Sequence, residues 1–240
     1  DEVIVPSFTY IASAEVIALL NLVPVMVDVN YDSFNTTAEN FERAITRKTK
    51  AFIPVHLFGQ SCDMGKIMEL AREYKIPVIE DNAQSLGAEC ITDGGRKHAG
   101  TIGTMGCTSF FPSKNLGCMG DGGAIMTNDY TLAERVRIIA SHGQTVKYYH
   151  DIVGCNSRLD TLQAAILKVK LKYLDQYAQA RQKAAAIYDK GLAGVKGITL
   201  PKRMPFSTHV FNQYTLKVHD GKRNGLKDFL NRNGIPSMIY

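Results

Sequence analysis

The sequence predicts an α/β fold in which helices cover both faces of a mainly parallel sheet. Over the first 81 residues, short β-branched runs alternate with longer segments of helical periodicity, which is typical of parallel β-α-β units. Two of the runs are closed by the acidic residues Asp28 and Asp81. Of the 240 residues, 45% are hydrophobic and 21% are charged, a composition that agrees with an ordinary globular protein.

The first part of the chain contains four predicted strands and three predicted helices. Runs rich in valine and isoleucine place the strands at residues 3–5, 25–29, 51–55 and 77–80. Apolar residues at helical spacing place the helices at residues 10–21, 37–45 and 63–74. Thr37 and Asp63 stand where the second and third helices begin, and both residue types favour the N-cap position.

The pattern changes in the middle of the chain. Residues 92–123 are rich in Gly, Ser and Thr, and a loop-rich stretch of this length inside an α/β domain is usually functional. It includes a short apolar run at 108–111, and another follows at 124–127. Helices are predicted at 131–141 and 158–192, the second broken near 174–176, followed by a strand at 210–218 and a helix at 222–233.

These elements indicate a large α/β domain and part of a second, smaller α+β domain. We place the large domain at residues 1–175 and the start of the small domain at residues 176–240. The chain enters a strand at once and stops inside an apolar run. We therefore expect the large domain to lack its N-terminal part and the small domain to be truncated.

The composition argues against several classes of function. The net charge of +5 is modest and spread along the chain, which suits attraction of small anions better than binding of nucleic acid. No apolar run approaches the roughly 18 residues that a membrane span needs. The five cysteines form no CxxC pair and are odd in number. We therefore expect no disulfide framework, no metal site, and a reducing, cytoplasmic location.

Lys114 has the surroundings that best suit covalent chemistry. It lies in the segment Thr108-Ser-Phe-Phe-Pro-Ser-Lys-Asn-Leu-Gly117, among apolar and small residues. Partial burial would lower the pKa of the lysine and free its amine to react with a carbonyl group. The alternative is a solvated loop lysine that stays protonated.

Other residues add groups that a phosphorylated ring could use. Asp81 ends a predicted parallel strand, where α/β sheets bind ligands, and could contact a protonated ring nitrogen or simply cap the next segment. Ser109 and Ser113 stand near the glycine-rich residues 117–123 and could hold a phosphate. Tyr10 follows the first strand and could stack on a flat cofactor or lie in the core.

Together these groups suit pyridoxal 5′-phosphate. Its aldehyde takes a lysine amine, its ring nitrogen takes a carboxylate, its phosphate takes neutral donors, and its ring takes an aromatic face. No spacing of His, Cys, Asp and Glu suggests a metal site. His56, His142 and His150 are better explained by structural hydrogen bonds than by contact with a nucleotide.

Five ordered segments resemble a known family. They are Asp1-Glu-Val-Ile-Val-Pro-Ser-Phe-Thr-Tyr10, Pro54-Val-His-Leu-Phe-Gly59, Ile79-Glu-Asp-Asn-Ala-Gln84, Ser109-Phe-Phe-Pro-Ser-Lys-Asn-Leu-Gly117 and Asn156-Ser-Arg-Leu-Asp-Thr-Leu-Gln-Ala-Ala165. The whole chain resembles the DegT/DnrJ/EryC1/StrS family of nucleotide-sugar aminotransferases. The resemblance implies an aspartate aminotransferase-like (type I) fold. The family also carries a Gly-Thr phosphate-binding motif before the first of these segments and continues beyond Tyr240.

The resemblance implies roles for five residues near the cofactor. Lys114 would bind the aldehyde of pyridoxal 5′-phosphate, Asp81 would contact the ring nitrogen, and Gln84 would pack against the ring. Tyr10 would stack on the ring and Ser109 would bind the phosphate.

Two further residues would act across a subunit boundary or on the substrate. The resemblance implies that Asn156 reaches the phosphate of the neighbouring subunit's cofactor, and hence a homodimer with shared active sites. Arg158 is a weaker candidate for contact with an acidic group of the substrate.

The resemblance implies an aminotransferase that moves an amino group from glutamate to a nucleotide-linked keto-sugar and releases 2-oxoglutarate. The segments around Lys114 and Asn156 look most like members that aminate C3 of a UDP-2-acetamido-3-keto sugar acid in surface-polysaccharide synthesis. Three alternatives stay open: amination at C4 of a 4-keto-6-deoxy sugar, a sugar dehydratase on the same scaffold, and a non-catalytic relative. Lys114 speaks against the dehydratases, because those relatives carry histidine at this position.

Overall fold

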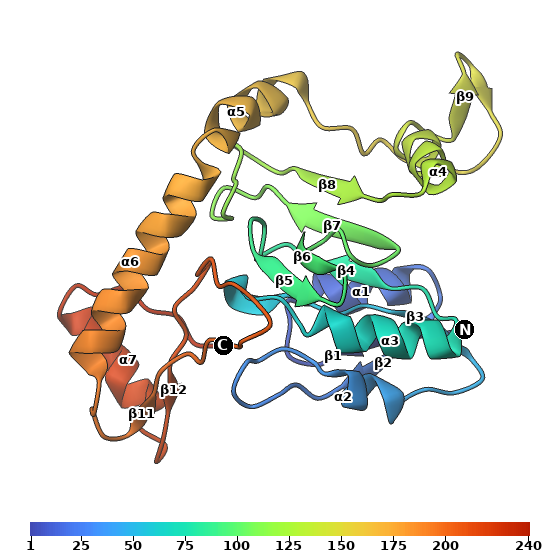
Figure 1. Cartoon of the computed structure of the whole chain (residues 1–240). Helices are drawn as coiled ribbons and strands as arrows, with labels where there is room; N and C mark the ends of the chain where they lie inside the picture. Colours follow the sequence, from blue (N-terminus) through green and yellow to red (C-terminus); the bar gives the residue numbers. More distant parts are fainter.

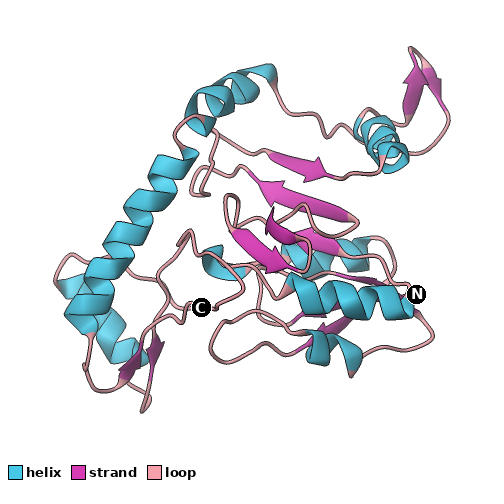
Figure 2. Cartoon of the chain, viewed as in Figure 1, coloured by secondary structure: helices cyan, strands magenta, loops and turns pink.

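A mixed sheet forms the centre of the computed structural model, which describes residues 1–240 (Figures 1 and 2). Its strands are β1 (Glu2–Pro6), β2 (Val23–Val27), β3 (Thr49–Phe52), β4 (Ile79–Asp81), β7 (Met105–Ser109) and β8 (Gly123–Met126). One part has the order β2-β1-β3 and the other the order β4-β7-β8. The parallel bridges Phe52–Val78 and Val55–Asp81 join the two parts. Only β7 and β8 pair antiparallel, so the predicted mainly parallel sheet is confirmed.

Helices cover both faces of this sheet, as predicted. The helices of the chain are α1 (Ala12–Leu19), α2 (Ala38–Glu42), the 3-10 turn η1 (Leu57–Gly59), α3 (Met64–Tyr74), α4 (Tyr130–Ala140), α5 (Thr161–Leu171), α6 (Leu174–Leu192) and α7 (Arg223–Arg232), of which α1, α2 and α3 pack on the sheet. On one face, Ile4 of β1 belongs to a core that also contains Phe41 of α2 and Ile67 of α3. On the other face, Val5 packs in a core with Ile17 of α1. Neighbouring residues of β1 serve opposite cores because successive side chains of a strand point to opposite faces.

Three short strand pairs lie outside the sheet. They are β5 (Glu89–Thr92) with β6 (Gly95–His98), β9 (Gln144–Val146) with β10 (Tyr149–His150), and β11 (Ile198–Thr199) with β12 (Lys217–Val218). The β5–β6 hairpin reaches into a stretch that the sequence pattern assigns to loop. Its turn contains Asp93-Gly94-Gly95, in which Gly95 has a φ of 89°, and this glycine-containing turn sequence is the signal that could have predicted it.

The predicted strand at residues 210–218 is wrong over most of its length, because only β12 is a strand there. Phe211 has a φ of 47°, a left-handed conformation that interrupts an extended chain. The Phe211 ring also stacks on the ring of His209 at a centroid distance of 3.8 Å. The segment therefore turns back towards η1, where the Val210 N–H donates to the Gly59 carbonyl at 2.8 Å.

The predicted break in the long helical segment is confirmed, since α5 ends at Leu171 and α6 begins at Leu174. The expected domain boundary between residues 175 and 176 falls in the first turn of α6, which runs unbroken to Leu192 (Figure 1). The division into two domains stays a prediction. None of the helices combines the length and the apolar character that crossing a membrane requires.

Candidate active site

The carboxylate of Asp81 is held in one orientation at the end of β4. Its Oδ1 accepts a hydrogen bond from the Ala83 N–H at 3.0 Å, and its Oδ2 accepts one from the Ser13 hydroxyl at 2.7 Å. The Asp81 backbone N–H donates to the Pro54 carbonyl at 2.9 Å. These bonds place a fixed negative charge at the carboxyl edge of the parallel strands, where α/β sheets bind ligands.

Lys114 follows β7, the strand that pairs with β4 on the side away from β3. The side chain is half-buried, and burial lowers the pKa of Lys114 below its usual value of 10.5, while the negative charge of Asp81 acts in the opposite direction. The burial and lowered pKa agree with the sequence prediction. An amine with a lowered pKa keeps a larger neutral fraction near pH 7, which is the form that attacks a carbonyl.

The residue after Lys114 is anchored on two sides. The Asn115 side chain accepts a hydrogen bond from Arg181 of α6 at 2.9 Å and donates to the Leu86 carbonyl at 3.4 Å. Gly117 then lets the chain fold back, because a Cβ there would lie 2.4 Å from the Pro112 carbonyl oxygen. The sequence analysis missed the contribution of Arg181, which lies 66 residues from Asn115.

Three other predicted residues lie at the end of a strand of the sheet or in the loop that follows one. The Gln84 Oε1 accepts a hydrogen bond from the Phe58 N–H at 2.7 Å, which fixes the amide so that its NH₂ group faces away from that contact. Ser109 accepts from the Phe111 N–H at 3.2 Å, and its own hydroxyl proton is left to donate elsewhere. Tyr10 is 74% exposed and follows β1. The carboxyl ends of β1, β4 and β7 thus carry Tyr10, Asp81, Gln84, Ser109 and Lys114.

A buried charged group that the sequence analysis missed supports this edge. Glu80 is fully buried next to Asp81, and its oxygens accept hydrogen bonds from the Gly100, Ile102 and Gly103 N–H groups at 2.6 to 2.8 Å. The same carboxylate lies 2.9 Å from His56 Nε2. Because His56 Nδ1 accepts from the Cys62 N–H at 3.2 Å, Nε2 carries the proton and donates it to Glu80. His56 therefore has the structural role that the sequence analysis favoured.

Asn156 and Arg158 form no hydrogen bond with the other predicted site residues. Both are exposed and lie in the segment between β10 and α5, which runs beyond β8 (Figure 1). The Arg158 Nε donates to Asn156 Oδ1 at 3.1 Å. Asn156 also forms an antiparallel bridge with Ser141 at the end of α4. The two side chains therefore face solvent on the far edge of the sheet from β3.

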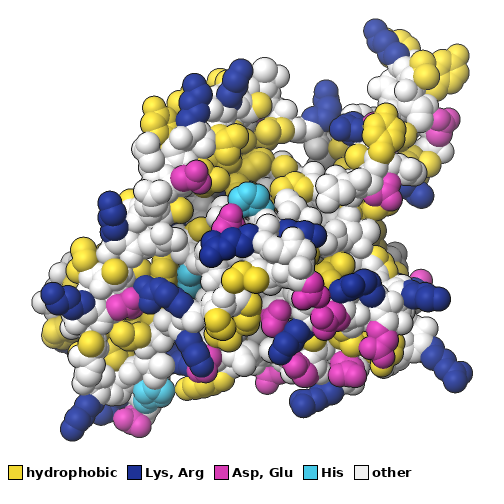
Figure 3. Space-filling view, viewed as in Figure 1, with side chains coloured by type: hydrophobic (Ala, Val, Ile, Leu, Met, Phe, Trp, Pro, Cys, Tyr) yellow, Lys and Arg dark blue, Asp and Glu magenta, His cyan; other side chains and the backbone are white.

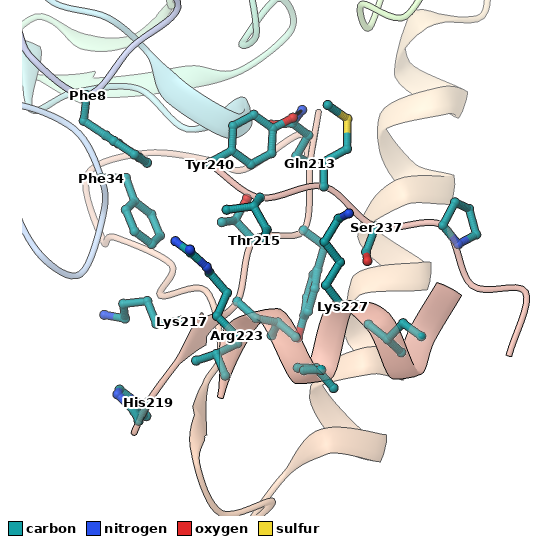
Figure 4. Close-up of a pocket in the computed structure, with 18 of the residues that line it drawn as sticks. Phe8, Phe34, Gln213, Thr215, Lys217, His219, Arg223, Lys227, Ser237 and Tyr240 are labelled. Atoms are coloured by element: carbon teal, nitrogen blue, oxygen red, sulfur yellow. Dashed lines mark hydrogen bonds between the residues drawn. The ribbon is translucent and has the colours of Figure 1, made fainter. Parts of the chain in front are cut away.

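A large cavity lies away from these residues. It has a volume of about 820 Å³ and is lined by Phe8, Tyr31 and Phe34 together with residues from 213 to 240 (Figure 4). None of the predicted site residues lines it. The candidate chemistry therefore belongs to the sheet edge and not to this cavity.

The fold and the sheet edge can be compared with known proteins. A family model described as the DegT/DnrJ/EryC1/StrS aminotransferase family matches residues 1–240. The UDP-2-acetamido-2-deoxy-3-oxo-D-glucuronate aminotransferase of Pseudomonas aeruginosa is 48% identical over 240 residues, which are 100% of this chain and 65% of that protein. The pleiotropic regulatory protein of Geobacillus stearothermophilus is 46% identical over 242 residues, 100% of this chain and 63% of that protein.

A solved structure supports the same relationship. NtdA from Bacillus subtilis, determined with bound cofactor PMP, is 35% identical and superposes with a TM-score of 0.86 over 97% of this chain and 53% of that chain. The chain therefore spans a little under two thirds of the two curated relatives and about half of the solved one. The family match over every residue, together with these identities, establishes that the chain belongs to the DegT/DnrJ/EryC1/StrS aminotransferase family.

Proposed function

We propose that the protein is a pyridoxal 5′-phosphate-dependent aminotransferase that moves an amino group from glutamate to a nucleotide-linked keto-sugar. One observation carries this proposal. The half-buried amine of Lys114 and the fixed carboxylate of Asp81 lie at the same edge of the sheet, close enough for the charge of Asp81 to act on the lysine. A protein that only bound a sugar would not need this amine.

The residues at this edge fit the cofactor. Lys114 offers an amine to the aldehyde, and Asp81 offers an oriented carboxylate to a protonated ring nitrogen. Ser109 has a hydroxyl proton free for a phosphate oxygen, and the exposed ring of Tyr10 offers a face for stacking. When bound, pyridoxal 5′-phosphate supplies a ring that accepts electrons from the carbon next to the amino group.

Lys114 is assigned two tasks in this proposal. Its amine would hold the cofactor between turnovers, and the released Nζ would move a proton between the α-carbon of glutamate and the cofactor. Proton transfer by a positioned side chain contributes typically about 10² to 10⁴ in rate. The burial that lowers the pKa of Lys114 favours the neutral amine that begins this exchange.

The substrate assignment rests on a relative's name. The protein of Pseudomonas aeruginosa that is 48% identical to this chain is named for a UDP-linked 2-acetamido-3-oxo sugar acid. We assign to this protein amination at C3 of a sugar of that class, for surface-polysaccharide synthesis, with Arg158 as the contact for the acidic group. Amination at C4 of a 4-keto-6-deoxy sugar is the second candidate.

The partner assignment rests on exposed apolar surface. Side chains of this kind cluster on α5 and on the arm formed by residues 141–160 (Figure 3). Val153 is 97% exposed, Tyr148 is 79% exposed and Leu162 is 72% exposed. Exposed apolar patches of this extent mark interaction surfaces. We assign this surface to a homodimer in which Asn156 of one subunit reaches the cofactor phosphate of the other.

The location assignment rests on the cysteines. All five are unpaired in the structure. Free thiols are usual where the environment is reducing, so we assign the protein to the cytoplasm.

The function is tested with the full-length protein, pyridoxal 5′-phosphate and borohydride, which traps a cofactor bound to lysine. Mass spectrometry should locate the adduct on Lys114, and the glutamate-treated enzyme should aminate a member of a panel of UDP- and dTDP-keto-sugars, identified by NMR. The Lys114→Ala variant should lose at least about 100-fold in rate. Absence of an adduct would favour a non-catalytic, regulatory protein, and loss of the sugar hydroxyl without gain of nitrogen would favour a dehydratase.

A further inference from the structure

A chain of two hydroxyls, those of half-buried Thr9 and buried Ser13, leads to the carboxylate of Asp81. Ser13 lies in the first turn of α1, is only 6% exposed, and contacts Asp81 Oδ2 at 2.7 Å across 68 residues of sequence. Thr9, which stands between β1 and α1, lies with its Oγ1 3.1 Å from the Ser13 hydroxyl oxygen. These three side chains link the loop after β1 to the end of β4.

The chemistry of the groups sets the direction of the chain. An ionised carboxylate only accepts hydrogen bonds, so the single hydroxyl proton of Ser13 goes to Asp81. Ser13 then has no proton left for Thr9, and the Thr9 hydroxyl must donate to the Ser13 oxygen. A hydroxyl that accepts a hydrogen bond is polarised and becomes a better donor. Thr9 therefore strengthens the bond from Ser13 to Asp81.

The two oxygens of Asp81 are held by different means. Oδ1 is held by a backbone N–H two residues away, which any sequence would supply. Oδ2 is held only by the Ser13 side chain. Without Ser13 the carboxylate keeps one anchor and is free to swing about it, so the side chain of residue 13 decides where the second oxygen points.

We propose that Ser13 is a positioning residue that aims the Asp81 carboxylate at the protonated ring nitrogen of the cofactor, an inference that rests on the proposed function. With Ser13 bonded to Oδ2 and the Ala83 N–H bonded to Oδ1, each carboxylate oxygen keeps a further lone pair for another donor. In this proposal Ser13 acts only through Asp81. Its effect should therefore depend on the presence of a ring nitrogen.

The test compares two ligands in the full-length protein. Dissociation constants of pyridoxal 5′-phosphate and of its deaza analogue, in which a carbon replaces the ring nitrogen, are measured by equilibrium dialysis for wild type, Ser13→Ala and Ser13→Thr. Hydrogen bonds to charged groups are strong enough for a loss of about tenfold. Ser13→Ala should weaken binding of pyridoxal 5′-phosphate by about tenfold and leave binding of the deaza analogue within about twofold. Ser13→Thr keeps the hydroxyl and should restore the wild-type ratio.

A matched control distinguishes the loss of Asp81 positioning from the general effect of removing a buried hydroxyl group. Ser61 is also fully buried, but its hydroxyl donates to the Cys62 carbonyl at 2.8 Å and not to a carboxylate. Ser61→Ala should leave the ratio of the two dissociation constants unchanged. If Ser13→Ala weakened both ligands equally, or weakened neither, the positioning role would be wrong while the proposed function stood. Failure of the wild-type protein to bind pyridoxal 5′-phosphate at Lys114 would instead overturn the proposed function.

Discussion

At the scale of single residues, the environment of one amine separates it from the other lysines of the chain. Lys114 stands behind β7 with its side chain half-buried, facing the charge of Asp81. Burial penalises the ammonium form more than the nearby carboxylate favours it, so the pKa falls. This balance, and not the mere presence of a lysine in a loop, is what suits the residue to carbonyl chemistry.

The lowered pKa of Lys114 gives a prediction about its reactivity. Because its amine loses the proton at a lower pH than an ordinary lysine, it should acetylate at a lower pH than a lysine amide standard in the same solution. The measurement is competitive labelling of the cofactor-free protein over a pH series, read by mass spectrometry. A midpoint equal to that of the standard would show that burial does not affect this amine.

Glu80 gives a second prediction at this scale, on stability. Burial would raise the pKa of the Glu80 carboxyl, but His56 and two backbone N–H groups outweigh it, so the pKa lies below 4.5. The ionised form therefore stabilises the fold above about pH 4.5, and this contribution is lost as pH falls through the lowered pKa. Leaving buried donors without their charged acceptor costs about 1.5 to 3 kcal/mol. Glu80→Gln should lower the free energy of unfolding by about that much at pH 7.

Urea unfolding at several pH values checks this prediction. The difference between wild type and Glu80→Gln should shrink as the pH falls through the lowered pKa of Glu80. The surface pair of Glu89 with Arg96 at 3.3 Å supplies the control, since Glu89→Gln should change the free energy of unfolding by less than about 1 kcal/mol. A difference for Glu80→Gln that did not change with pH would mean that its charge is not the stabilising feature.

At the scale of elements, the packing of β7 depends on a close backbone approach. A Cβ at Gly106 in β7 would lie 1.9 Å from the Gly100 carbonyl oxygen. The Gly100 turn cannot easily retreat, because its N–H is held by Glu80 at 2.8 Å. The site loop after β7 therefore owes its position to a glycine in the strand and to a buried acid in the neighbouring strand.

Two glycine substitutions test the importance of this close approach. One adds a Cβ where it would overlap backbone, and the other adds a Cβ where there is open space. Gly106→Ala should destabilise the protein by about 3 kcal/mol or more, because the new methyl group overlaps backbone. Gly225 lies in α7 with open space around it, so Gly225→Ala should stabilise the protein by about 0.5 to 1 kcal/mol through helix propensity. Thermal unfolding of both variants compares them with wild type. A Gly106→Ala variant as stable as wild type would show that β7 can move.

The elements also show where sequence patterns succeed and where they fail. Thr37, Asp63 and Asp129 accept from the third N–H of their helices, and each helix starts within a residue of its predicted start. Caps and apolar periodicity act over one or two turns, so they can be read from the chain. The left-handed backbone at Phe211 depends on the packing of that segment against η1, and no local signal marks it.

At the scale of the whole molecule, the arm of residues 141–160 is a feature whose apolar side chains are left exposed in a single chain. It extends from the body of the protein (Figure 1), and its residue Asn156 is exposed. If the arm reaches a second subunit, its apolar side chains become buried and Asn156 meets a partner's cofactor. Formation of the dimer and binding of the cofactor are then coupled.

Substitution of Val153, which is 97% exposed on this arm, tests the coupling. Val153→Asp places a charge in the proposed interface, so the protein should elute as a monomer in light-scattering chromatography and should bind pyridoxal 5′-phosphate at least about tenfold more weakly. Ile187 is 73% exposed on α6, a helix that lies apart from the arm (Figure 1), and Ile187→Asp is the control that should stay dimeric. A dimeric Val153→Asp variant would place the interface elsewhere.

The sequence by itself determined the β-α-β order, the strand ends that carry Asp81 and Lys114, and most helix starts, because caps, periodicity and residue chemistry are local properties. Only the tertiary structure decided which partners hold those residues. Ser13 reaches Asp81 across 68 residues, and Arg181 reaches Asn115 across 66. Such partners follow from the packing of the entire chain. No pattern in a short stretch of sequence encodes these partners. The environment of Lys114 is therefore visible only in the folded chain.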